Sequence, residues 1–359
     1  FDTKDGSAMQ DLAKNGAEPN AFTASSLTGY YFDCTEHFEE NLKILLRFVS
    51  VPYFTQESVD KERGIIAQEI RMVEDNPDWQ IYQQLLQALY VRHASRVPIA
   101  GTVESIAEIT PQTLYDCHKA FYTPANMVLT VVGDVRPDRV FEAAERILPA
   151  ESGPDIERDY GDEPEAVHQK EVTRRMEVSA PQFLLGFKCP PLERGESGYR
   201  TELLGDLAWD ILLGESSPLY QRLYEDGTIN GSFGGAFDTL PGAACLYAGG
   251  DCKEPRKVAE AILREAERLQ RDGIDPDYWQ RTLRAAFGST LRGLNSFENI
   301  AVGLAEGHFQ GYDALRFPLV YESIQPEDIL AFLRQNVREV RMALSRILPQ
   351  EQEKEGTDA

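Results

Sequence analysis

A weak internal repeat is the feature that most limits how this 359-residue chain can fold. Gln10–Gly16 is followed by Phe22, and the same spacing recurs where Gln221–Gly227 is followed by Phe233. The two matches lie 211 residues apart, since 221 minus 10 is 211. Self-similarity at a fixed offset indicates that a structural unit has been duplicated.

The back of each half carries a second match. Pro111 and Pro326 each precede a predicted helix, and Met127-Val-Leu-Thr and Met342-Ala-Leu-Ser begin sixteen residues after them. This offset is 215 (326 minus 111), so one short insertion reconciles it with the offset of 211 at the front. Two matches in the same order favour duplication over chance, and we expect two homologous domains.

Hydrophobic periodicity predicts an α+β fold with long helices against antiparallel or mixed sheets. An acidic stretch with few apolar residues, 151–170, is predicted to be an exposed linker between a first domain, 1–150, and a second, 171–359. Predicted helices cover residues 35–50, 55–75, 78–92, 111–121, 137–147, 198–213, 217–225, 255–272, 276–292, 297–310 and 326–336, and predicted strands cover 127–132, 171–178, 182–189, 231–238, 243–251 and 341–348.

The repeat also predicts that the two copies differ in length. Because the offset at the front is 211, residue 1 falls opposite residue 212. The two strands and the helix predicted within 171–211 then have no counterpart in the first copy. We therefore expect the first copy to lack its opening part, at least about 40 residues on this alignment.

Charge and cysteine content exclude several classes of protein. The chain has 36 basic and 59 acidic residues, a net charge of −23, which disfavours binding to nucleic acid or to an anionic membrane surface. Five cysteines without a CxxC pair argue against a disulfide framework and a cysteine zinc site, and they predict a reducing, cytoplasmic setting. The sequence has no run of 18 apolar residues, so no membrane span is predicted.

The helix predicted at 55–75 carries two carboxylates at a costly position. At about 100° per residue, its apolar face is predicted to consist of Val59, Ile65, Ile66, Ile70 and Val73. Glu62 and Glu69 fall in the middle of that face, where a carboxylate must be paired, hydrogen-bonded or bound to a cation. Alternatively, the face is wetter than its apolar content suggests, and both glutamates are solvated or bridged to an arginine.

This helix and its neighbours resemble the pitrilysin, insulin-degrading enzyme and mitochondrial processing peptidase family of zinc metallopeptidases. The resemblance extends along most of the chain and is carried by Asn20-Ala-Phe-Thr23, Pro52-Tyr-Phe54, Glu62-Arg-Gly-Ile-Ile-Ala-Gln-Glu-Ile70, Glu74-Asp-Asn-Pro77, Ala100-Gly-Thr-Val-Glu-Ser-Ile106, Phe121-Tyr-Thr-Pro-Ala-Asn-Met127 and Val131-Val-Gly-Asp134. It implies a clamshell of two homologous domains, each with helices on one face of a sheet. It also implies a zinc-dependent endopeptidase that hydrolyses extended peptides.

The resemblance assigns roles to individual residues. In this family an H-x-x-E-H motif supplies two histidine ligands and a general base, and a downstream glutamate completes the zinc site. Glu69 matches that glutamate and is the expected Zn²⁺ ligand, with Glu62, one helical repeat earlier, as its supporting residue in the catalytic site. Asn20, Ala21 and Phe22 match an edge-strand segment that pairs with an extended substrate.

Two departures limit what the chain is expected to do alone. Its five histidines form no H-x-x-E-H, so the motif is expected ahead of residue 1 and the chain as given is predicted to be inactive. The family's second domain often holds substrate with an Arg and a Tyr, but Tyr224 stands at the first position and Asn230 or Gly231 at the second, with Arg222 out of phase. We therefore expect a homologous partner subunit or a homodimer. The alternative is a non-catalytic peptide-binding or scaffold subunit of the same fold.

Overall fold

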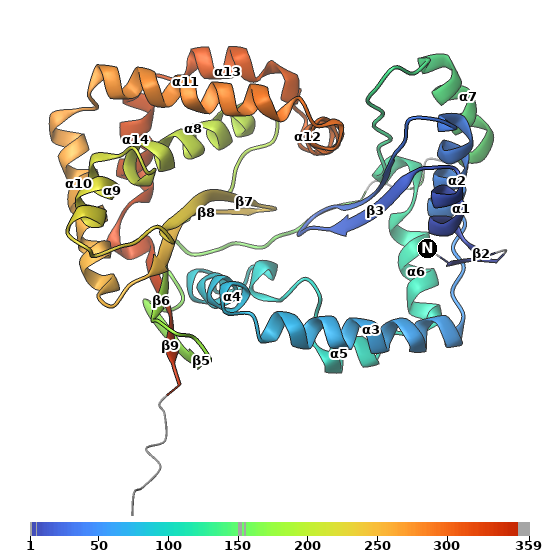
Figure 1. Cartoon of the computed structure of the whole chain (residues 1–359), viewed down its shortest axis with the longest axis horizontal. Helices are drawn as coiled ribbons and strands as arrows, with labels where there is room; N and C mark the ends of the chain where they lie inside the picture. Colours follow the sequence, from blue (N-terminus) through green and yellow to red (C-terminus); the bar gives the residue numbers. More distant parts are fainter. Residues whose placement is uncertain (1, 5, 150–152, 154–155, 351–359) are drawn as a thin grey trace, which may run out of the picture. The chain divides into compact units, whose positions relative to one another are not determined.

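The computed structural model describes residues 2–4, 6–149, 153 and 156–350, and it confirms an α+β fold (Figure 1). The chain divides into two compact units. The first comprises residues 1–70, 99–159 and 293–309, and the second comprises residues 71–98, 160–292 and 310–359. Each unit therefore includes a segment from the other half of the sequence. The predicted boundaries at 150 and 171 divide the chain by its sequence repeat and not by its spatial contacts. They stay a prediction.

A five-stranded sheet organises the second unit. Its strands lie in the order β5-β9-β6-β8-β7, with β5 parallel to β9 and the other neighbours antiparallel. They span Glu171–Met176 (β5), Gln182–Cys189 (β6), Gly234–Leu240 (β7), Ala243–Asp251 (β8) and Met342–Pro349 (β9). The helices around them are α4 (Pro77–Leu89), α8 (Glu196–Leu213), α9 (Pro218–Glu225), α10 (Pro255–Asp272), α11 (Pro276–Gly293), α13 (Phe317–Ser323) and α14 (Pro326–Asn336).

Helix α4 begins where its sequence caps it and then packs on one face of this sheet. The Asn76 side chain accepts a hydrogen bond from the N–H of Asp78, and Pro77 fits the first helical turn. The buried contacts between helix and sheet are made by Ile81, Leu85, Ala88, Leu89, Leu184, Ala243, Cys245, Ala343 and Ile347. The close approach requires Gly186 on β6, because a Cβ there would lie 2.9 Å from both methyl carbons of Leu85.

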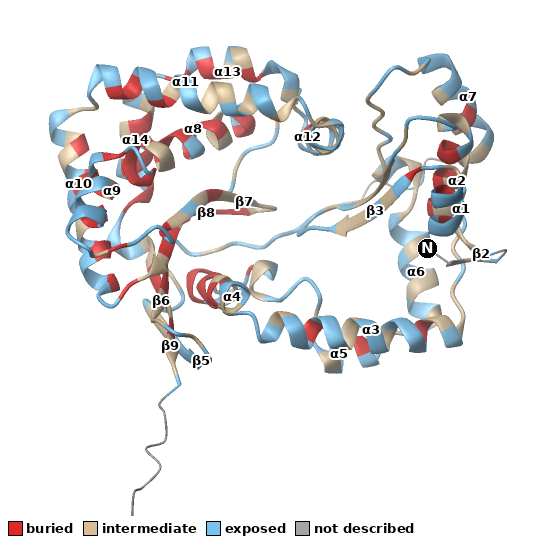
Figure 2. Cartoon of the chain, in the orientation of Figure 1, coloured by how far each residue is buried: buried red, intermediate tan, exposed pale blue. Residues whose placement is uncertain are grey.

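Helices α8 and α14 cover the opposite face of the sheet. Phe237 of β7 packs edge to face on Phe332 of α14, with ring centroids 5.3 Å apart. The same phenyl ring lies over Gly205 of α8, where it occupies the space that a Cβ would need. Buried residues therefore gather on both faces of the central strands, as Figure 2 shows.

The first unit is built mainly from helices. Its described strands form two antiparallel pairs, β1 (Asp2–Thr3) with β2 (Gly6–Ser7) and β3 (Glu18–Thr23) with β4 (Thr28–Asp33). Its helices are α1 (Ala8–Lys14), α2 (Phe38–Ser50), most of α3 (Gln56–Glu74), α5 (Val103–Ala107), α6 (Pro111–Phe121), α7 (Pro137–Ile147) and most of α12 (Phe297–Gln310). One core cluster, between α2 and α7, holds Leu42, Leu46 and Ala143.

The order of elements repeats between the two halves of the sequence. The series α1-β3-β4-α2-α3-α4-α5-α6 is matched by α9-β7-β8-α10-α11-α12-α13-α14. Helices α4 and α12 hold equivalent places in the series, and each belongs largely to the compact unit that contains most of the other copy. This order supports the duplication that the sequence predicts.

The strand predicted at residues 127–132 was wrong for this chain. These residues form no regular element, and Leu129 is 37% exposed. The equivalent strand in the second copy, β9, bonds to β5 on one side and β6 on the other. Among the described residues no strand lies beside 127–132, so the segment has no ladder to satisfy its backbone N–H and C=O groups.

Most of the described residues in the predicted acidic linker are exposed, and Glu163 is an exception. Residues 151, 152, 154 and 155 lie outside the described residues, but the Glu163 side chain is only 11% exposed, and its carboxylate accepts a 2.8 Å hydrogen bond from Lys188. Glu165 pairs with Arg338 and Arg341 at 3.0 and 3.1 Å. Composition indicated a solvated stretch because it does not reveal that buried cations lie opposite the acids. No described helix has the length and apolarity needed to cross a membrane.

The packing of α4 predicts opposite outcomes for two glycine substitutions. Gly186→Ala should lower the free energy of unfolding by about 1–3 kcal/mol, because its methyl group overlaps Leu85 in a close-packed core. Gly64→Ala, in the exposed middle of α3, should raise it by about 1 kcal/mol, because nothing lies within 4 Å and alanine favours the helix. Urea unfolding of both variants checks this, and wild-type stability in Gly186→Ala would contradict the described packing.

Candidate functional site

Helix α3 places Glu62 and Glu69 on its exposed side, which corrects the prediction that they lie within the buried face. The buried residues of α3 are Val59 and Ile70, and Ile65 is 49% exposed. At about 100° per residue, Glu62 and Glu69 lie roughly 70° and 90° from the centre of the face formed by Val59 and Ile70. The prediction included Ile65 in the buried face, and this placed the centre of that face near Glu62 and Glu69.

The two carboxylates are free to bind a ligand. Neither Glu62 nor Glu69 has a hydrogen bond or an ion pair within the part of the chain that the structure describes. The solvated alternative left open by the sequence therefore describes this chain. Within the same residues, no three His, Cys, Asp or Glu side chains come together as a metal site. Because zinc in a protein needs three or four ligands, the described residues do not by themselves fit a zinc ion.

Asn20, Ala21 and Phe22 lie in β3, as an edge-strand role requires. Strand β3 pairs with β4 in the register Ala21 to Tyr30, and no other described strand pairs with it. The N–H of Ala21 donates to the side-chain oxygen of Asn20 at 2.9 Å. Gly29 on β4 leaves room for the Phe22 ring, which would overlap a Cβ there. Among the described residues, β3 is therefore an edge strand, with β4 on one side and no strand on the other.

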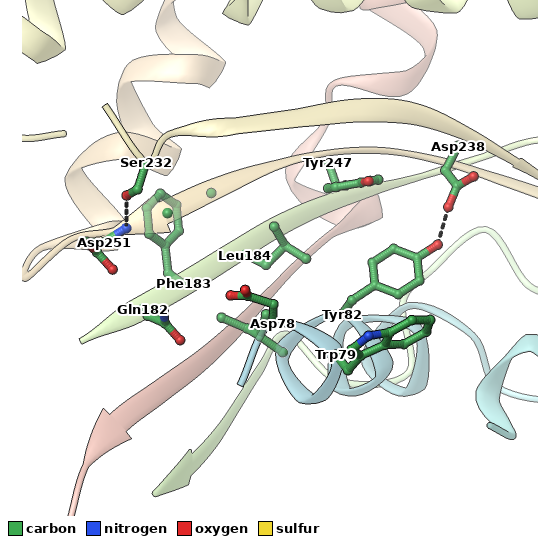
Figure 3. A pocket seen from close by; sticks show the side chains of 13 residues that line it. Asp78, Trp79, Tyr82, Gln182, Phe183, Leu184, Ser232, Asp238, Tyr247 and Asp251 are labelled. Carbon is green, nitrogen blue, oxygen red and sulfur yellow. Dashed lines mark hydrogen bonds between the residues drawn. The ribbon is translucent and has the colours of Figure 1, made fainter. Parts of the chain in front are cut away.

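A pocket that the sequence did not reveal opens between α4 and the sheet of the second unit (Figure 3). Its volume is about 530 Å³. Trp79 and Tyr82 enter it from α4, and Phe183, Asp238 and Tyr247 line it from β6, β7 and β8. The signal for it in the sequence was weak, because aromatic residues on an amphipathic helix are usually core residues.

A tyrosine and an aspartate meet inside this pocket. The Tyr82 hydroxyl donates a short hydrogen bond to a carboxylate oxygen of Asp238. Burial raises the pKa of the Asp238 carboxyl above its usual range, and the hydrogen bond from Tyr82 opposes that rise. The pocket combines apolar walls with the carboxylates of Asp78, Asp238 and Asp251, which suits a ligand that offers a hydrogen-bond donor or a positive charge.

The segment where the family resemblance predicts a substrate-binding Arg and Tyr makes contacts within the chain instead. Arg222 donates to the buried Glu265 carboxylate at 2.7 Å. Tyr224 is 53% exposed and stacks on Tyr220, with centroids 5.9 Å apart. The side-chain oxygen of Asn230 accepts hydrogen bonds from Ser232, which lines the pocket. None of these residues presents a free guanidinium to a ligand.

The sequence resembles family models and curated proteins that are described as M16 peptidases or zinc proteases. The family described as insulinase, peptidase family M16, matches residues 3–103, and the one described as peptidase M16 inactive domain matches residues 108–286. An uncharacterized zinc protease of Bacillus subtilis is 36% identical over 357 residues, which cover 97% of this chain and 82% of that protein. A second uncharacterized zinc protease of that organism is 27% identical over 285 residues, covering 78% and 68%.

Solved structures share the fold. The crystal structure of a putative M16-like peptidase from Alicyclobacillus acidocaldarius is 29% identical, with a TM-score of 0.91 over 98% of this chain and 84% of that one. A protease from Helicobacter pylori is 18% identical, with a TM-score of 0.83 over 95% and 84%. The second likeness is one of fold alone.

The Tyr82–Asp238 pair predicts a pH-dependent loss of stability. Tyr82→Phe should lower the free energy of unfolding by about 1–3 kcal/mol, because it leaves a partly buried carboxyl without its donor. The loss should be larger at neutral than at acidic pH, because the hydrogen bond from Tyr82 lowers the pKa of Asp238 and so stabilises the charged carboxylate. Trp79→Ala, an exposed residue of the same pocket, should stay within about 0.5 kcal/mol of wild type. Urea unfolding at both pH values measures this, and equal losses would contradict it.

Proposed function

This chain belongs to peptidase family M16, the insulinase family, and we propose that it forms the body of a zinc-dependent endopeptidase that acts on extended peptides. The relative from Bacillus subtilis with 36% identity is called a zinc protease and is covered over 82% of its length. Family membership supplies the reaction class. In the proposed site, residues of this chain provide one zinc ligand and a strand that binds the substrate.

The observation that carries the proposal is the position of Glu69. Its carboxylate is exposed on a long helix, without a partner among the described residues, in a segment that matches the family motif. Such a carboxylate suits a metal ligand. Glu62, one helical repeat earlier on the same side, would support it. The remaining ligands, two histidines of an H-x-x-E-H, would have to come from residues outside this chain, so we expect the chain alone to be inactive.

Strand β3 is the proposed place for the substrate. An extended peptide would pair with its open edge at Asn20–Phe22, so that backbone hydrogen bonds give affinity and side-chain pockets give selectivity.

A homologous partner, or a second copy of this chain, is proposed to complete the site. The support is that Arg222 is held by Glu265 and that Tyr224 stacks on Tyr220, so the expected Arg and Tyr are missing from this segment. A complete parent protein that cleaves peptides as a pure monomer would contradict the partnership.

A second candidate is a non-catalytic peptide-binding or scaffold subunit. It is favoured by the match of residues 108–286 to the inactive domain of the family. The two candidates differ in whether H-x-x-E-H lies upstream of Phe1 in the complete protein, so the sequence of that segment distinguishes them.

The zinc role of Glu69 is testable in the complete parent protein. Glu69→Gln should abolish both zinc retention after dialysis and peptide hydrolysis, because it removes a charged ligand. Glu62→Gln should reduce metal affinity or activity by about 10- to 100-fold, as expected of a residue that supports a ligand. Zinc content by mass spectrometry and cleavage of a fluorogenic peptide measure both. A Glu69→Gln protein that keeps its metal and its activity would refute the assignment.

A further inference from the structure

The Glu163 carboxylate occupies an unusually well-defined site in the second unit. One of its oxygens accepts from the N–H of Val91 at 3.0 Å and from the Lys188 ammonium at 2.8 Å. The other accepts from the N–H groups of Arg92 and His93, the latter at 2.6 Å. The side chains of Glu163 and Lys188 are only 11% and 4% exposed. Four donors therefore converge on one carboxylate with little water around it.

The donors are held in place by groups other than Glu163. Arg96 donates to the carbonyl of Val91 at 2.7 Å, which fixes the turn that carries the three N–H groups. The ring Nε2 of His93 lies 2.6 Å from the carbonyl of Pro241, and a carbonyl only accepts, so Nε2 carries the hydrogen. Lys188 also lies 5.2 Å from the centroid of the Tyr90 ring, which stabilises its charge.

Such an arrangement is an anion site in its own right. Successive backbone N–H groups that point to one centre bind carboxylates and phosphates, and a buried ammonium beside them adds a full positive charge. Without an anion, the Lys188 charge would be buried and unpaired, which is strongly unfavourable. Glu163 thus fills a site whose chemistry calls for a carboxylate.

Glu163 lies in a segment that runs beside α4 and that we call the strap, residues 160–174. The ring of Tyr160 lies 6.0 Å from that of His93, at the far end of α4. Further along, the N–H of Gln169 donates to the carbonyl of Ala88 at 2.9 Å. Arg174 reaches Gln80, near the beginning of α4. The strap therefore runs beside α4 in the opposite direction, and its last residues, 171–174, belong to strand β5 of the sheet.

We propose that the N–H groups of Val91, Arg92 and His93, together with Lys188, form a carboxylate-binding site, and that Glu163 is its built-in ligand. Its occupancy fastens the strap to the residues that follow α4. The site accepts one carboxylate group in a defined position, so a small carboxylate such as acetate takes the place of the side chain once that is removed.

The strap also connects to the helix that carries Glu69. Gln80, which Arg174 contacts, donates from its amide nitrogen to the carbonyl of Val73 at 3.4 Å, near the end of α3. Fastening α4 therefore restrains the last turn of α3. The carboxylate site itself does not depend on the proposed zinc chemistry.

Chemical rescue tests the proposal on the chain as it stands. Glu163→Ala should raise the unfolding equilibrium constant by about a hundredfold or more, because it leaves Lys188 buried without a counter-charge. Sodium acetate should then restore stability in a saturable way, when compared with sodium chloride at the same ionic strength. The wild type and Glu165→Ala, which removes an acid that is 49% exposed in the same strap, should show no such difference.

Every outcome of this experiment decides the question. Equal stability of Glu163→Ala in acetate and chloride would overturn the proposal. If that variant is unfolded in chloride, acetate should refold it, and failure to do so would also overturn it. Hydrogen exchange gives a local readout, since the amides of residues 91–93 should lose protection in Glu163→Ala and regain it with acetate.

The charge of Glu163 predicts an acid-dependent loss of stability. Burial alone would raise the pKa of this carboxyl, but hydrogen bonds from Lys188 and the three N–H groups outweigh burial and lower the pKa to about 2. The groups packed around it are Tyr90, Arg92, His93, Arg96, Lys188 and Arg341. Its contribution is complete above the unfolded-state pKa of about 4.3 and is lost as the pH falls toward about 2. Glu163→Gln should lack this part of the acid transition. An identical acid transition in the wild type would contradict the assignment.

Discussion

The close approach of helix α4 to strand β6 is the contact on which the second unit depends. Leu85 and Leu89 reach the sheet at Gly186, where a larger residue would hold the helix away. Because α4 lies against the sheet there, its first turns form a wall of the pocket, and the residues just after its end present the three N–H groups that bind Glu163. Both features are products of one helix–sheet contact.

The sequence predicted most of the regular elements, and its errors have physical causes. Periodicity located α3, but the exposed Ile65 moved the predicted buried face onto Glu62 and Glu69. Alternation cannot show whether a strand has a partner, so residues 127–132 were predicted as strand although the described chain offers them none. The ion pairs of the strap were not predicted, because Glu163 and Glu165 are far in sequence from Lys188 and Arg341 and meet them only in the folded chain.

The candidate functional residues also differ in whether the sequence could reveal them. Family resemblance identified Glu69 and β3 because their residues are contiguous in sequence. The pocket draws on α4, β6, β7 and β8, which lie far apart in the chain, so only the fold brings Tyr82 to Asp238. Short motifs can be recognised from a sequence alone, whereas sites assembled across a sheet require its register to be known.

The exchange of α4 and α12 between the two compact units affects how the chain can be divided. A fragment cut at the acidic segment would begin near Glu171 and would leave behind the helix that covers Ala243, Cys245 and Ile347. That face of the sheet would then meet water as a continuous apolar surface, which favours aggregation. A soluble second half has to include residues 71–98. The boundary between the two sequence repeats therefore differs from the boundary between the two compact units.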